Sequence, residues 1–192
     1  MGTLAVNQGL QVLGGYGYTE DFPLEQMARD VRIMSIYEGT TGIHGLTLLG
    51  RGIPANNGQA LQTLGKWIAK DIESGKSSDL VAKYAGLLED EVANLTKVTM
   101  HKLGIAMKGE FDVFLADSSL YMELFGIVTV AWQWLKQGNV AAAAIKAGGL
   151  STDELAFYQD KIHTMKFFFH YEVPKTLGLS KRLLDEEILT IF

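Results

Sequence analysis

Helical periodicity constrains this chain more than any other feature of its sequence. Apolar residues recur at spacings of three to four, as at Leu64, Ile68 and Ile72, whereas the strict alternation typical of strands is almost absent. Prolines, which break helices, occur only at positions 23, 54 and 174. We therefore predict an all-α protein: an antiparallel, up-and-down helical bundle with two glycine-containing loops near the N-terminus.

The segment GIPANNG, residues 52–58, interrupts this periodic pattern. Glycine, proline and asparagine favour turns over helices, so this segment is the best domain boundary in the sequence. We predict one domain over residues 1–53 and a second domain, a helical bundle, over residues 54–192.

Helix boundaries follow from glycines, prolines and capping residues. Gly14 and Gly15 should end a first helix, Pro23 should start a second one, and Ser151 with Glu154 matches a capping box. The predicted helices cover residues 3–13, 24–33, 41–52, 111–135, 151–173 and 181–189, and two further apolar stripes cover residues 61–72 and 80–103. Ser78 or Asp79 is expected to cap the second of these stripes.

The composition excludes several classes of function. The chain has no cysteine, which removes disulfides, thiolate nucleophiles and sulfur-rich zinc sites. Its four histidines, at positions 44, 101, 163 and 170, lack zincin and di-iron spacing, so we predict no metal site. With a net charge of −5 and scattered basic residues, no nucleic-acid partner is expected.

The same features bear on location. The apolar run from Leu124 to Leu135 is shorter than the roughly 20 residues that a bilayer-spanning helix needs, so we predict no membrane span. No secretion signal is visible at the N-terminus. We expect a cytoplasmic protein.

Two loops stand outside the core pattern, at residues 14–18 and 37–42. The first loop, GGYGY, could bring backbone amides close to a phosphate. It lacks the full G-x-G-x-x-G spacing and follows a helix instead of a strand, so it is not a Rossmann fingerprint. From the residues alone, a plain helix stop is the stronger interpretation.

In the second loop, Glu38 stands between Tyr37 and Gly39 at the start of a predicted helix. A carboxylate that aromatic and apolar neighbours shield from water is suited to act as a general base. Alternatively, Glu38 only complements the dipole of the following helix. The residues by themselves leave both interpretations open.

Residues 11–40, QVLGGYGYTEDFPLEQMARDVRIMSIYEGT, closely resemble the C-terminal signature of the flavin-dependent acyl-CoA dehydrogenases. A Q-x-x-G-G-x-G loop, an aromatic residue, a proline-started helix with Arg-Asp and an E-G-T loop occur in the family's order and spacing. The resemblance covers about residues 4–53. Residues 55–192, which include FYQDKIHTMKFFFHYEVPK, look like the extra helical domain of one bacterial branch of that family.

This resemblance implies a role for Glu38. It would be the base that removes the α-proton of an acyl-CoA thioester while a β-hydride passes to N5 of FAD. The backbone N–H of Glu38, together with a ribityl hydroxyl of the flavin, would stabilise the developing charge on the thioester oxygen.

The resemblance also implies contacts with cofactor and substrate. Gln11 and Gly15 match positions that touch the FAD of a neighbouring subunit, and Gly39 and Thr40 match the loop against the subunit's own flavin. Tyr37 would line the acyl pocket. The implied partners are an acyl-CoA substrate, electron-transfer flavoprotein as acceptor, and further copies of the chain in a homo-oligomer, as a dimer or tetramer.

The chain departs from the family in two respects. Gly42 and His44 replace the glutamines of the common E-G-T-x-Q-I-Q pattern. The family's amino-terminal helical domain and central β-domain have no counterpart, so we expect a C-terminal portion that is inactive alone. An acyl-CoA oxidase-like enzyme and a non-catalytic helical oligomerisation module remain alternatives.

Overall fold

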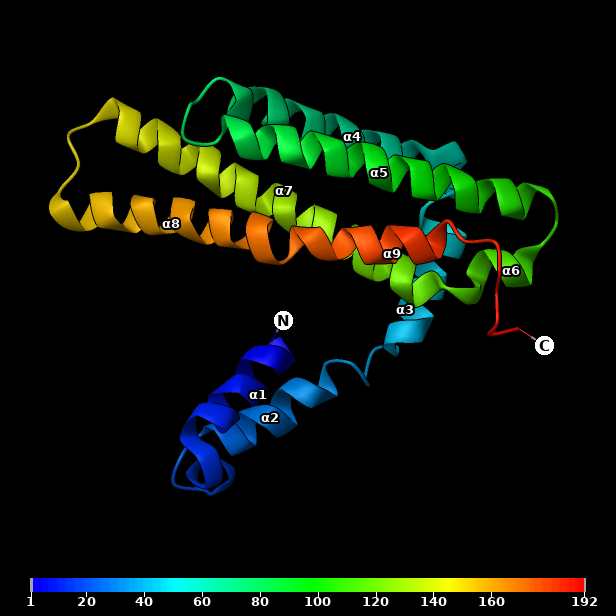
Figure 1. Ribbon diagram of the computed structural model, residues 1–192, viewed down its shortest axis with the longest axis horizontal. Coiled ribbons are helices and arrows are strands. Elements are labelled where there is room, and N and C mark those ends of the chain that lie inside the picture. The colour runs from blue at the N-terminus through cyan, green and yellow to red at the C-terminus, as the bar shows by residue number, and fades with distance from the viewer. Residues whose placement is uncertain (1, 192) are drawn as a thin grey trace. The chain divides into compact units, whose positions relative to one another are not determined.

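The computed structural model describes residues 2–191, which form helices joined by turns and loops (Figure 1). No strand occurs among these residues, so the all-α prediction is confirmed. The chain divides into two compact units that meet between His44 and Gly45. We call residues 2–44 the hairpin unit and residues 45–191 the bundle unit. The domain boundary predicted after residue 53 stays a prediction.

The hairpin unit pairs α1 (Gly2–Leu13) with α2 (Leu24–Ile33) through the 3₁₀ turn η1 (Gly14–Tyr18). The helices approach closely because α1 presents glycine to α2: a Cβ atom on Gly9 would lie 3.1 Å from Cδ1 of Leu24. As predicted, α1 ends just before Gly14, which adopts a left-handed φ of 59° that glycine tolerates.

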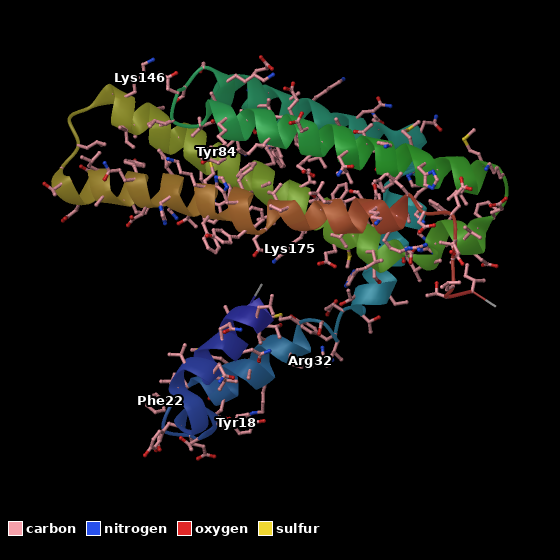
Figure 2. The ribbon with its side chains drawn as sticks, in the orientation of Figure 1. Tyr18, Phe22, Arg32, Tyr84, Lys146 and Lys175 are labelled. Atoms are coloured by element: carbon pink, nitrogen blue, oxygen red, sulfur yellow. The ribbon has the colours of Figure 1, made fainter. Side chains whose placement is uncertain are left out.

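The hairpin unit has no hydrophobic core of its own. Among residues 2–44 only Gly17 is buried, and no apolar side chain is. Figure 2 shows Tyr18 and Phe22 near the end of the hairpin where η1 lies. Its large exposed apolar side chains are Leu4, Val12, Tyr16, Tyr18, Phe22, Met27, Ile33, Met34, Ile36, Tyr37 and Ile43.

A distorted segment leads into the bundle unit. The helix α3 (Thr41–Thr47) continues as the π-helical turn η2 (Leu48–Gly52), in agreement with the helix predicted over residues 41–52. Three consecutive residues, Asn56 to Gly58, then adopt left-handed conformations. Asparagine and glycine tolerate this region best, which explains why the GIPANNG segment interrupts the helical pattern.

The bundle unit consists of four long helices that alternate in direction (Figure 1). They are α4 (Ala55–Lys76), α5 (Ala82–Met107), α7 (Ser118–Ala147) and α8 (Thr152–Tyr171). Shorter elements complete the unit, namely α6 (Phe111–Ala116), η3 (Val173–Lys175) and α9 (Thr176–Leu183). After η3, α9 continues in the direction of α8.

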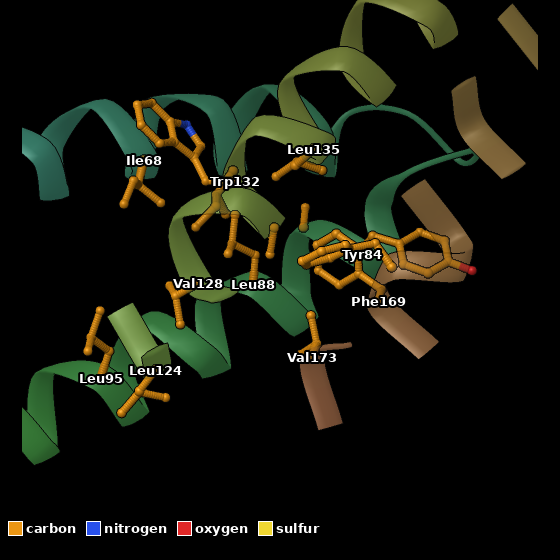
Figure 3. Close-up of a cluster of buried hydrophobic side chains, with 14 of the residues drawn as sticks. Ile68, Tyr84, Leu88, Leu95, Leu124, Val128, Trp132, Leu135, Phe169 and Val173 are labelled. Carbon is orange, nitrogen blue, oxygen red and sulfur yellow. The ribbon is translucent and has the colours of Figure 1, made fainter. Parts of the chain in front are cut away.

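The core lies between these helices (Figure 3). Leu88, Leu124 and Leu135 are completely buried there. Helix α7 approaches α8 closely at Gly138, where an added Cβ would lie 2.5 Å from Sδ of Met165 on α8. The glycine at position 138 therefore lets the Met165 side chain of α8 pack directly against the backbone of α7.

Helix termini show where local signals succeed and fail. The predicted capping box is present at the start of α8. The Ser151 hydroxyl accepts a hydrogen bond from the backbone N–H of Glu154, and the Glu154 carboxylate accepts one from the backbone N–H of Ser151. The predicted cap at Ser78 or Asp79 is wrong, because Val81 precedes α5 without any side-chain cap.

Two predicted helices have the wrong bounds. Residues 111–135 form two helices, because the chain breaks at Asp117, whose carboxylate accepts a hydrogen bond of 3.3 Å from Nε of Arg182. The last helix runs from Thr176 to Leu183 instead of over residues 181–189. Its inward face includes the buried polar residues Thr176 and Ser180, which an apolar pattern does not reveal.

Candidate functional site

The residues that the sequence singles out lie at the two ends of α2. Gln11 and Gly15 lie where α1 ends and η1 begins, and Tyr37 to Thr40 follow the opposite end of α2. The ten residues of α2 span about 15 Å. The structure thus brings Tyr37 to Thr40 together in one loop and leaves Gln11 and Gly15 apart from them.

In the first loop, the backbone is closely packed at Gly17 and open at Gly15. A Cβ on Gly17 would lie 2.9 Å from the carbonyl oxygen of Leu10, so only glycine fits there without a shift of backbone. A Cβ on Gly15 would meet nothing within 4 Å. Gln11, in the last turn of α1, is exposed. The main chain at Gly15 is therefore accessible to a ligand.

The second loop is turned by two left-handed residues in succession, Glu38 with φ 59° and Gly39 with φ 106°. For a residue other than glycine, such a conformation costs on the order of 1–3 kcal/mol, and it persists where the surroundings impose it. Strain of this kind is concentrated at functional sites. Glu38 is thus held in a conformation that its own side chain disfavours.

The same loop presents unpaired backbone donors. Within the described part of the chain, the N–H groups of Glu38, Gly39 and Thr40 donate to no backbone carbonyl. The Glu38 side chain is exposed and forms no hydrogen bond or ion pair with residues 2–191. The described residues therefore do not supply the shielding from water that the interpretation of Glu38 as a general base calls for.

Two neighbours of Glu38 are placed by local contacts. The hydroxyl of Tyr37, whose side chain is half-exposed, donates to Sδ of Met34 at 3.2 Å. The carbonyl of Thr40 accepts from the backbone N–H of His44 at 3.0 Å. Thr40 itself is exposed, so its side chain remains available for a ligand.

His44 belongs to this site, although the sequence marked it only as a departure from a family pattern. A Cβ on Gly39 would lie 3.2 Å from Nε2 of His44. The imidazole therefore packs against the bare Cα of Gly39, next to the candidate base. The available signal was its position four residues after Thr40, one helical turn further along the chain.

The bundle unit contains a buried cation. The Lys102 side chain on α5 is completely buried, and its Nζ has no hydrogen-bond partner among the described residues. Burial lowers the pKa of the Lys102 ammonium, opposed by the negative charge of Asp117 and reinforced by the positive charge of Arg182. Because Asp117 is already paired with Arg182, Lys102 has no carboxylate of its own.

Within residues 2–191, no three histidine, aspartate or glutamate side chains gather in a way that could hold a metal ion. None of the described helices is both long enough and apolar enough to cross a bilayer.

Comparison with known families divides the chain in two. Residues 1–53 match the family described as acyl-CoA dehydrogenase, C-terminal domain. Residues 60–189 match the family described as acetyl-CoA dehydrogenase C-terminal like. Both families therefore concern the C-terminal portion of such enzymes.

Comparison with curated proteins gives relatives over nearly the whole chain. The broad-specificity linear acyl-CoA dehydrogenase FadE5 of Mycobacterium tuberculosis is 31% identical, over 97% of this chain and 31% of that protein. The 3-methylmercaptopropionyl-CoA dehydrogenase of Ruegeria pomeroyi is 30% identical, over 92% of this chain and 29% of that protein. The chain thus spans about a third of the length of these relatives.

A further relative matches over a much shorter stretch. The acryloyl-CoA reductase (NADH) of Anaerotignum propionicum is 60% identical over 38 residues, which are 20% of this chain and 10% of that protein. High identity over so short a stretch indicates that one local element of the sequence is shared.

Proposed function

Because the chain belongs to the acyl-CoA dehydrogenase family, we propose that its hairpin unit supplies the catalytic base and part of the flavin site for α,β-dehydrogenation of an acyl-CoA thioester. The observation that carries this proposal is the loop from Tyr37 to Thr40. It combines a strained carboxylate-bearing residue with unpaired backbone donors, inside the segment that matches the family.

Glu38 is the proposed base. Its carboxylate takes the α-proton of the thioester, and its backbone N–H donates to the thioester carbonyl oxygen as negative charge develops there. The backbone donor matters because a proton beside a thioester is only weakly acidic until the enolate oxygen is stabilised. The exposed Glu38 side chain requires that the bound acyl group itself contributes to the exclusion of water.

The family implies FAD, and the residues present fit it. Gly39 and Thr40 offer backbone N–H groups that have no partner among the described residues and to which the cofactor can bond. Bound FAD would supply the acceptor for the β-hydride. Gln11 and Gly15, at the other end of α2, are too far away to serve that same contact, so we propose that they bind the FAD of a neighbouring subunit in a homo-oligomer.

Tyr37 completes the proposed site. Its half-exposed ring adjoins Glu38 and would line the acyl pocket. We further propose that electron-transfer flavoprotein reoxidises the enzyme. An oxidase would instead pass its electrons to oxygen. Measuring the rate of flavin reoxidation with each of the two acceptors distinguishes these cases.

The test of the proposal is Glu38→Gln in a FAD-loaded enzyme that contains this chain as its C-terminal portion. Glutamine keeps the size of the side chain and the backbone donor but cannot take the proton, so anaerobic bleaching of the flavin by acyl-CoA should slow by about 100-fold or more, with FAD content unchanged. Glu20→Gln, a matched exposed glutamate in the loop before α2, should bleach at the original rate. Undiminished bleaching in Glu38→Gln would refute the assignment.

A further inference from the structure

A second candidate site lies wholly within the bundle unit. A groove of about 630 Å³ runs between α4, α7 and α8 and is lined by both polar and aromatic side chains. Its volume falls within the range of about 300–1,000 Å³ that is common for small-molecule sites. No residue of the hairpin unit contributes to it.

The groove contains a cation that no carboxylate neutralises. Lys161 on α8 is half-buried, and its Nζ lies 5.3 Å from the ring centre of Phe157 and 6.0 Å from that of Trp134. Among the described residues it forms no ion pair. An ammonium group flanked by aromatic rings on a half-buried lysine is suited to receive an anion, because apolar surroundings strengthen the attraction.

The positive charge of Lys136, the second lysine of the groove, is partly balanced by an acidic residue. Nζ of Lys136 lies 5.3 Å from the ring of Trp132, whose Nε1 donates to Oδ2 of Asp71 at 2.6 Å. The indole thus joins Lys136 to an acidic residue on α4. Lys161 is therefore the lysine of the groove that is not linked to an acidic residue, and a ligand with one anionic group near Lys161 fits this arrangement.

An aromatic platform adjoins Lys161. The ring of Phe157 is 55% exposed, and the ring of Tyr158 meets it nearly edge-on, with centroids 5.4 Å apart. An exposed ring held from one side is a stacking surface for a planar heterocycle. Gln133 and Gln137, one turn apart on α7, also line the groove. Their amides can form hydrogen bonds with ligand hydroxyl groups that lie between the ring and the anionic group of the ligand.

We propose that this groove binds a nucleoside monophosphate, with the base on Phe157, the sugar at Gln133 and Gln137, and the phosphate at Lys161. The net charge of the chain is −5, so anions are not attracted to it without a local site. The proposal is independent of the dehydrogenase function, because it uses no residue of the flavin or acyl-CoA loops.

Calorimetric titration of the purified 192-residue chain with AMP tests this proposal. AMP should bind at least tenfold more tightly than adenosine, which lacks the anion, and than ribose 5-phosphate, which lacks the ring. Lys161→Met should weaken AMP binding at least tenfold and leave adenosine binding unchanged. Phe157→Ala should weaken both ligands.

The control is Lys146→Met, which removes an exposed lysine near the end of α7 (Figure 2) and outside the groove. Lys146→Met should leave AMP binding unchanged. If methionine at position 161 disturbs the helix, Lys161→Gln repeats the test with a polar side chain. Equal affinity for AMP and either of its parts would overturn the proposal. So would an equal loss of AMP affinity in Lys146→Met and Lys161→Met.

Discussion

The hairpin unit and the bundle unit use apolar residues in opposite ways. In the bundle unit, residues such as Leu88 and Leu124 fill a core shared by four long helices. In the hairpin unit, Leu4 and Val12 are 63% and 84% exposed, and no apolar side chain is buried. The bundle unit has the contacts to hold its own fold, whereas the hairpin unit presents its apolar residues to whatever binds it.

The difference extends to the backbone. Glu38 and Gly39 adopt left-handed conformations in the hairpin unit, next to donors without partners. The long helices α5, α7 and α8 have no such interruption. The loop that carries the proposed chemistry thus combines a left-handed glutamate with unpaired backbone donors, whereas the left-handed non-glycine residues of the bundle unit, Asn56 and Asn57, lie at the start of α4.

The largest expected effect is the removal of a core side chain. Leu124→Ala should lower the free energy of unfolding by about 2–5 kcal/mol, because it deletes buried methyl groups and leaves a cavity. The matched change Leu4→Ala in the hairpin unit should alter it by less than about 0.5 kcal/mol. Urea unfolding followed by circular dichroism measures both. A similar loss for both variants would contradict the contrast between the units.

The second effect tests an exception inside the core. Lys102→Met should raise the free energy of unfolding by about 1–4 kcal/mol, because it replaces a buried ammonium that has no hydrogen-bond partner with an apolar chain of similar length. Lys97→Met, an exposed lysine on the same helix, should have little effect. Denaturant unfolding of the two variants at neutral pH gives the comparison.

The pH dependence gives a second measurement on Lys102. Its folded pKa is lowered from the ordinary value of 10.5, mainly by burial. Between the lowered value and 10.5 the unfolded chain binds more protons, so the stability of the native protein should rise with pH in that window. In Lys102→Met this rise should disappear. An unchanged profile would show that Lys102 titrates alike in both states.

The sequence predicts many helix boundaries in both units because their signals are local. The capping box at Ser151, the glycine stop at Gly14 and the stripe at Ile68 and Ile72 each depend on neighbouring residues, and each appears where expected. The break at Asp117 was missed because an ion pair with Arg182, far away in the sequence, accompanies it. Long-range contacts of this kind leave no periodic pattern.

The candidate site was predictable in a different way. The composition around Glu38 allowed two interpretations, and only the resemblance of residues 11–40 to a family favoured one of them. The left-handed conformation of Glu38 and the contact of His44 with Gly39 are properties of the folded loop. No propensity scale favours glutamate at positive φ, so the sequence pattern could not reveal the strain.

The smallest effect separates packing from binding within one loop of the hairpin unit. Gly17→Ala should destabilise the end of α1 by about 1–3 kcal/mol, because its Cβ would meet the carbonyl oxygen of Leu10 at 2.9 Å. Gly15→Ala should leave α1 unaffected, since its Cβ would meet nothing within 4 Å. Hydrogen exchange of the α1 amides distinguishes the two.

If Gly15 also contacts FAD as we propose, Gly15→Ala should weaken FAD binding although exchange is unchanged. Equal exchange in both variants would show that the loop yields to an added methyl group, and Gly17 would then have no special packing role.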